Sequence, residues 1–167
     1  MLQQQKVEYL CTTDDTTDSL EHHKSIHKQG IVPKVFPTFR PDKAFAAEEA
    51  ASYKSYLKKL EEVCNFSINT DQDLLQVLES RIDYFHEGGV RLSDHGLEQL
   101  YTFEENAYNS ETLFSNVLAE KTLSSQEVAF FKMKILLFLS KVYHKKGWTQ
   151  QFHLGAIRNN NKRLLTA

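Results

Sequence analysis

Short apolar runs bounded by polar residues predict four β-strands in this chain of 167 residues. The expected strands are residues 7–12, 34–39, 90–94 and 149–154. Between them, apolar positions follow the helical repeat in five segments, 18–30, 48–65, 70–89, 112–119 and 124–147. Strands that alternate with helices across long connections are typical of parallel βα units with right-handed crossovers.

Several of the expected helices carry signals for their ends and their buried faces. Asp18, with Glu21 three residues later, is expected to cap the first helix, and Gly30 to end it. Ser124 and Glu127 form a capping box for the last helix. The apolar stripes are Tyr53, Tyr56, Leu57, Leu60 and Cys64, then Leu74, Leu78, Ile82 and Phe85, and finally Phe130, Met133 and Leu137, which we expect to cover the sheet.

Every expected strand ends in residues that can do chemistry. These are Asp14 and Asp15, then Arg40, then Asp94 and His95, and finally His153. A (β/α)8 barrel builds its active site from such strand ends. A doubly wound sheet would usually add a glycine-rich phosphate turn, which this sequence lacks. We therefore expect a helix-rich α/β fold of parallel βα units. Because a whole TIM-like barrel takes eight strands and about 250 residues, the four strands of residues 1–167 should form a single partial barrel, about half of one.

The composition narrows the class of protein. Hydrophobic residues make up 41% and charged residues 25%, as in globular chains, and a formal net charge of −2 does not imply nucleic acid or an anionic membrane surface as a partner. The most apolar run is interrupted by Lys132 and Lys134 and is too short to cross a bilayer. Cys11 and Cys64 lack metal-type spacing. A cytoplasmic protein is expected.

Taken alone, each candidate residue also has an ordinary structural explanation. Arg40 could form an ion pair with Asp42 or Asp15, and His153, flanked by Phe152 and Leu154, could be a core histidine. Asp94 could start a turn into Gly96; on a regular strand it and His95 face opposite ways, and we expect Asp94 to point into the barrel mouth.

Two further pairs could hold a metal. Asp14 and Asp15 could do so, but we favour helix capping and loop closure for them. His23 and His27, four residues apart on one helix, are better explained as a solvated face.

Five motifs, in this order and at this spacing, resemble those of the uronate isomerases. They are CTTDD with DSLEHH, FRPDKAF, RLSDHGL and GWTQQFHLGAIRNNN. The resemblance to this family, also called glucuronate isomerase and placed in the amidohydrolase-like barrel superfamily, runs from Met1 to about Arg163. It implies that the four strands are similar to strands three to six of the family's barrel. It also implies isomerisation of D-glucuronate to D-fructuronate and of D-galacturonate to D-tagaturonate.

The resemblance also assigns roles to residues. Arg40 and Arg158 are expected to bind the uronate, and His153 and Asp94 to serve catalysis. Asn159–Asn161 are expected to support Arg158. The family implies a divalent metal, expected to be zinc, whose main ligands belong to a His-x-His motif before Met1 and an Asp-x-Arg motif after Ala167; neither pattern occurs here. Thr16 and Lys162 depart from the family's usual proline and threonine.

Three functional hypotheses remain. The chain belongs to a uronate isomerase and is inactive by itself; or it is a non-catalytic remnant or assembly piece of such an enzyme; or it belongs to a hydrolase on the same barrel. A half-barrel leaves its outer strands, near Val7 and Phe152, with unpaired backbone groups, so we also expect self-association through these edges.

Overall fold

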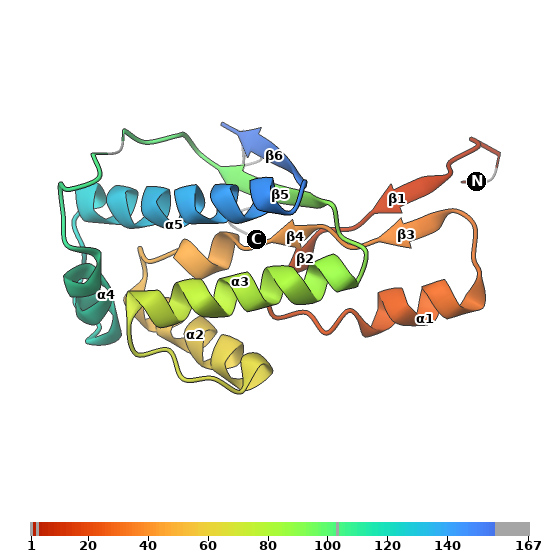
Figure 1. Cartoon of the computed structure of the whole chain (residues 1–167). Helices are drawn as coiled ribbons and strands as arrows, with labels where there is room; N and C mark the ends of the chain where they lie inside the picture. The colour runs from red at the N-terminus through yellow and green to blue at the C-terminus, as the bar shows by residue number, and fades with distance from the viewer. Residues whose placement is uncertain (1, 3, 103, 156–167) are drawn as a thin grey trace, which may run out of the picture.

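All four predicted strand regions are present and pair in parallel. The computed structural model describes residues 2, 4–102 and 104–155. The strands are β1 (Tyr9–Cys11), β2 (Asp14–Asp15), β3 (Lys34–Phe36), β4 (Phe39–Arg40), β5 (Leu92–Leu97) and β6 (Thr149–Leu154). A four-stranded sheet has the order β2-β4-β5-β6, and β1 pairs with β3 in a separate two-stranded sheet (Figure 1). The expected order is therefore confirmed, with the first two strands each divided.

The first two strands break side by side, at 12–13 and at 37–38. Pro37 has no N–H and cannot donate to a β-ladder, which explains the break in its strand. The carboxylate of Asp14 fills the gap, since its Oδ2 accepts from Thr38 N at 3.1 Å and from Thr12 Oγ1 at 2.6 Å. As a result, β1 and β3 extend beyond the helix-covered sheet, with α1 (Glu21–Gln29) beside β3 (Figure 1).

The other helices lie on one side of the four-stranded sheet, where they pack against the sheet or against one another and bury the apolar stripes. They are η1 (Asp42–Phe45), α2 (Ala50–Cys64), α3 (Asp71–Glu87), α4 (Ser110–Leu118) and α5 (Ser125–Lys145). The predicted stripes of α2 and α3 are confirmed: apart from the partly buried Cys64, every member is buried. Within the described residues, no helix is both long and apolar enough to cross a membrane.

The predicted buried face of α5 is partly wrong. Phe130 is buried, but Leu137 is 42% exposed, and the helix instead buries Phe131, Ile135 and Leu139. Apolar residues surround most of this helix, so its periodicity does not single out one face.

The predicted capping residue is confirmed for the last helix but is wrong for α1. Capping boxes are present at Ser124 with Glu127, as predicted, and at Thr70 with Asp73. Asp18 is not the cap of α1: Leu20 occupies that position, and Asp18 Oδ1 instead accepts from Leu20 N at 2.6 Å. An unbroken polar run, residues 12–19, precedes Leu20, so the sequence alone leaves the first helical residue ambiguous.

A polar cluster joins α3, α4 and α5. Asp71 Oδ2 accepts from Ser110 Oγ at 2.5 Å and from Lys134 Nζ at 3.0 Å. Burial alone would raise the pKa of Asp71, but these two hydrogen bonds hold that pKa below its ordinary value. The carboxylate therefore adds stability above its ordinary pKa, and that stability is lost as pH falls through the lowered value.

We expect Asp71→Asn to lower the free energy of unfolding at pH 7 by about 1–3 kcal/mol, because Lys134 loses a charge-assisted partner. The difference from wild type should shrink as pH falls below about 4. Urea titrations across this range measure it. Asp83→Asn, on the exposed face of α3, is the matched control. A difference independent of pH would contradict the assignment.

Candidate active site at the strand ends

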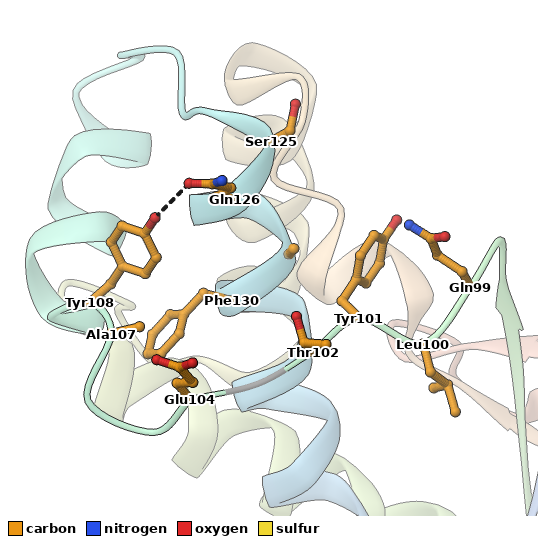
Figure 2. A pocket seen from close by; sticks show the side chains of 11 residues that line it. Gln99, Leu100, Tyr101, Thr102, Glu104, Ala107, Tyr108, Ser125, Gln126 and Phe130 are labelled. Atoms are coloured by element: carbon orange, nitrogen blue, oxygen red, sulfur yellow. Dashed lines mark hydrogen bonds between the residues drawn. The ribbon is translucent and has the colours of Figure 1, made fainter.

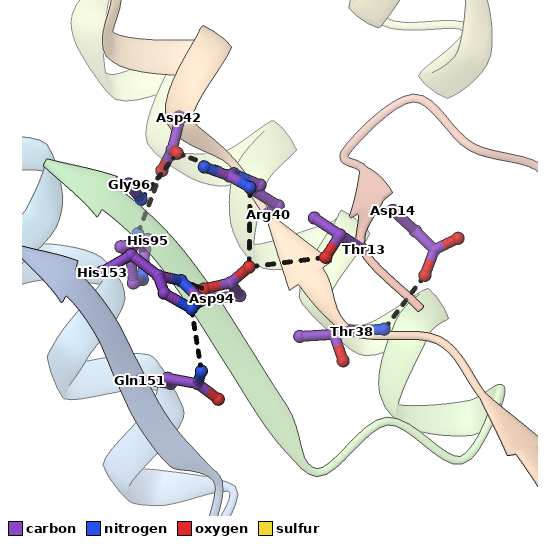
Figure 3. Close-up of polar contacts among 10 residues, drawn as sticks. All are labelled: Thr13, Asp14, Thr38, Arg40, Asp42, Asp94, His95, Gly96, Gln151 and His153. Atoms are coloured by element: carbon purple, nitrogen blue, oxygen red, sulfur yellow. Dashed lines mark hydrogen bonds and ion pairs between the residues drawn. The ribbon is translucent and has the colours of Figure 1, made fainter. Parts of the chain in front are cut away.

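Asp94 and His153 form a close pair on the sheet face opposite the helices. In the parallel register of β5 and β6, Gly96 is opposite His153 and Asp94 is opposite Gln151, so these residues share one face. His153 Nδ1 lies 2.6 Å from Asp94 Oδ1 (Figure 3). Because a carboxylate only accepts, Nδ1 carries the proton, and Nε2 faces the Gln151 amide nitrogen at 3.3 Å. The pair therefore fixes both the tautomer and the direction of the imidazole.

The surroundings of the two partners differ. Asp94 is buried, whereas the His153 side chain is half exposed. His153 is thus not a core histidine. Gly155, which follows β6 with a positive φ of 63°, lets the backbone turn there.

Arg40 joins this pair from β4. Its Nη1 lies 3.6 Å from Asp94 Oδ2, while its Nε donates to Asp42 Oδ2 at 2.9 Å. Thr13 Oγ1, from the neighbouring chain segment, lies 3.5 Å from the same Asp94 oxygen. Arg40 therefore forms the ion pair with Asp42 that the sequence suggested, and it also lies beside Asp94 (Figure 3).

Asp42 lies where β4, η1 and β5 meet. Besides Arg40, it accepts from Gly96 N at 2.9 Å, and His95 Nδ1 lies 3.4 Å from its Oδ1. Burial would raise the pKa of Asp42, but the contacts with His95, Gly96 and Arg40 lower it below its ordinary value. Asp42 is therefore a carboxylate, and it carries the charge that balances Arg40.

His95 faces the helices, as the alternation of β5 predicted. Its ring is fully buried against Phe45, Phe152 and Tyr143. Asp94 is accordingly the member of this adjacent pair that reaches the open face of the sheet.

Arg158 and Asn159–Asn161 lie outside the described residues. Their predicted roles stay predictions.

Asp15 closes a loop, as favoured from the sequence, but neither Asp14 nor Asp15 caps α1, and Asp14 instead bridges the broken strands. Asp15 accepts from both the N–H and the hydroxyl of Thr17 and pairs with Lys43 at 3.1 Å. Burial would raise the pKa of Asp15, but these contacts lower it.

The expectation that His23 lies on a solvated helix face is wrong. Its Nε2 lies 2.7 Å from Thr12 Oγ1, because α1 turns this residue back towards the broken strands.

A small open cavity of about 330 Å³ adjoins the cluster. Its lining is Thr13, Asp15, Arg40, Asp42 and Lys43. Two cationic side chains, Arg40 and Lys43, therefore border a space at the ends of β2 and β4.

A larger hollow of about 750 Å³ lies elsewhere, between the segment after β5 and the start of α5 (Figure 2). Tyr101, Tyr108 and Phe130 contribute aromatic surface, and Tyr108 bonds to Gln126. Among its described lining residues the only charge is the carboxylate of Glu104. That charge, which has no ion-pair partner among the described residues, disfavours an anionic sugar acid. In the smaller cavity Asp42 and Asp15 are each paired with a cation, Arg40 and Lys43, so that cavity suits such a ligand better.

Comparison with known proteins shows the family to which the chain belongs. A sequence profile described as Glucuronate isomerase matches residues 1–167. The chain belongs to the glucuronate isomerase family. It is 42% identical over 164 residues to the uronate isomerase of Bacteroides fragilis, covering 98% of this chain and 35% of that protein. The uronate isomerase of Cellvibrio japonicus is also 42% identical, over 165 residues, with the same coverage.

Solved structures agree with the fold of this family member. The crystal structure of the Thermotoga maritima uronate isomerase superposes with a TM-score of 0.85 at 28% identity, covering 99% of this chain and 37% of that one. The glucuronate isomerase of Caulobacter crescentus gives a TM-score of 0.84 at 24% identity, covering 99% and 34%, and supports the fold alone. This chain thus spans about a third of the length of its relatives. The expected α/β fold of an internal family segment is confirmed.

The sequence pattern indicates Asp42 only as a possible partner of Arg40 and indicates no role for Thr13, Lys43 or Gln151. The alternation along β6 could have found Gln151, since it is two residues from His153 on the same face. Asp42 follows a proline after the strand, where no periodicity places a side chain.

Proposed function

We propose that this chain supplies the part of a uronate isomerase that holds the sugar acid during aldose–ketose isomerisation. Membership of the family carries the proposal. The geometry supports it, because three residues carried over from the family motifs, Arg40, Asp94 and His153, come from separate strands and meet on one face. The reactions are those of D-glucuronate to D-fructuronate and of D-galacturonate to D-tagaturonate.

The roles follow from the chemistry of each group. The planar guanidinium of Arg40 can donate two parallel hydrogen bonds to a carboxylate or to vicinal hydroxyls. His153, with its Nδ1 proton held by Asp94, offers Nε2 to a sugar hydroxyl and can accept and return a proton there. Asp94 stabilises the imidazolium that forms when His153 takes up a proton. Arg158 is proposed as a second contact to the uronate.

The divalent metal implied by the family does not fit this chain alone. Among the described residues, no group of three or more histidine, cysteine or carboxylate side chains is arranged to hold an ion. Asp94 is engaged with His153, Arg40 and Thr13. We therefore assign no step of the reaction in this chain to a metal.

A hybrid enzyme tests the proposal. This chain would replace the matching segment of the Bacteroides fragilis uronate isomerase, to which it is 42% identical. We expect the hybrid to convert D-glucuronate to D-fructuronate. Because each group acts on bound sugar, His153→Gln should lower kcat by about 10²-fold or more, and Arg40→Gln should raise KM by about tenfold.

Lys54→Gln, which removes a surface cation paired with Glu120, is the matched control and should leave both constants unchanged. A folded hybrid without turnover would favour the alternative, a non-catalytic remnant. Hydrolysis of a sugar-acid derivative in place of isomerisation would favour the hydrolase.

A further inference from the structure

A series of five neighbouring side chains, from β4, η1, β5 and β6, links the buried face of the sheet to its open face. In order they are His95, Asp42, Arg40, Asp94 and His153 (Figure 3). Only the last three are explained by the proposed function. His95 and Asp42 lie on the helix side and at the strand end, so a bound sugar on the open face would not touch His95.

Asp42 contacts Arg40 at Nε, the one guanidinium nitrogen that is not terminal. Nε donates to Asp42 Oδ2, which leaves the Nη groups to reach Asp94 and a ligand. Since the guanidinium is planar, fixing Nε–H fixes the plane in which both Nη groups lie. Asp42 therefore fixes the orientation of the Arg40 guanidinium.

Asp42 is held by hydrogen bonds at one oxygen and faces His95 with the other. Oδ2 also accepts from Gly96 N at 2.9 Å, and Oδ1 faces His95 Nδ1 at 3.4 Å. The His95 ring is fully buried among aromatic rings, and neither of its nitrogens has a hydrogen-bond partner among the described residues; the Asp42 carboxylate is the charged group that Nδ1 faces. A polar ring in that position is costly unless it serves the carboxylate that it faces.

We propose that Asp42, supported by His95 and the Gly96 N–H, is a positioning residue that aims the Arg40 guanidinium at the uronate. The claim rests on the proposed function, because it explains how the anchoring arginine keeps one orientation. Asp42 acts through Arg40. His95 acts through Asp42, which it faces, while its own ring is held by the surrounding aromatic side chains.

The first test needs only the purified 167-residue chain. NMR would follow the Nε–Hε signal of Arg40 and its exchange with water. We expect Asp42→Asn to speed that exchange by about tenfold or more, since a charge-assisted acceptor is lost. His95→Phe, which keeps the aromatic packing, should speed it severalfold. Asp83→Asn, whose partner is Lys146, should leave it unchanged.

The second test uses the hybrid enzyme. Asp42→Asn should raise KM for D-glucuronate by about tenfold with kcat within about twofold, and His95→Phe should change KM in the same direction. A merely structural role for Asp42 would lower the melting temperature without altering either Arg40 exchange or KM.

The outcomes separate the two claims. An inactive hybrid with faster Arg40 exchange in Asp42→Asn would reject the proposed function and keep the positioning role. An active hybrid in which Asp42→Asn and His95→Phe change neither exchange nor KM would overturn the positioning role. If Asp42→Asn does not fold, the folded His95→Phe variant decides by the same two measurements.

Discussion

The purified 167-residue chain is expected to convert D-glucuronate to D-fructuronate at least about 10⁴-fold more slowly than the hybrid enzyme. Isomerisation through an enediol needs a base, a group that polarises the carbonyl, and an anchor. The chain offers Arg40 as an anchor and His153 as a proton acceptor, on an open sheet face. It contains neither a His-x-His nor an Asp-x-Arg pattern. Without a closed pocket, water competes for every polar contact.

The measurement is sugar turnover followed by NMR, with and without added zinc or manganese, and with the hybrid enzyme as the positive control. Metal-dependent turnover by the purified chain that disappears in His153→Gln would contradict this expectation. It would also mean that the residues of this segment suffice for catalysis.

We also propose that the purified chain self-associates through the edge of its sheet. β6 is the last strand of the four-stranded sheet, and its outer side has no partner strand among the described residues. Phe152 and Leu154 on this strand are 39% and 50% exposed. Unpaired backbone groups beside exposed apolar side chains favour pairing with another chain. Dimers or larger species should therefore form at tens of micromolar, an order of magnitude set by weak interfaces.

Light scattering across a dilution series checks this. Leu154→Lys should shift the chain towards monomer, because a charge on an edge strand opposes pairing. Leu137→Lys is the matched control: it adds the same charge at a residue that is 42% exposed on α5, away from the edge, and should leave association unchanged. A stable monomer with a cooperative melt would show that the chain protects its own edges.

The strands were predictable because each is marked by an apolar run of neighbouring residues in the sequence. Apolar runs placed β5 and β6 to within a few residues, and the spacing between strands implied parallel pairing. Pro37 predicts the break in the second strand, and this break is confirmed. The division of the first strand was missed, because the carboxylate of Asp14 that spans the gap acts between distant segments. The apolar pattern misplaced the buried face of α5, where tertiary packing chooses among several apolar faces.

The candidate site was partly predictable for the same reason. Strand alternation separated Asp94 from His95 correctly, since that rule is geometric. The role of Asp42 depends on three segments meeting in space, and one sequence does not reveal such a meeting. The likeness to family motifs brought out His153, which alone would resemble a core residue.

The projecting β1–β3 ribbon and its helix have a consequence for cooperativity. No residue of α1 is buried, and every residue of β1 is exposed. This part of the chain therefore contributes little to the free energy that holds the core together. Regions with few buried contacts open locally at a lower free energy than the rest of a protein. The molecule should accordingly behave as two folding units, with the arginine and histidine of the candidate site both in the more stable one.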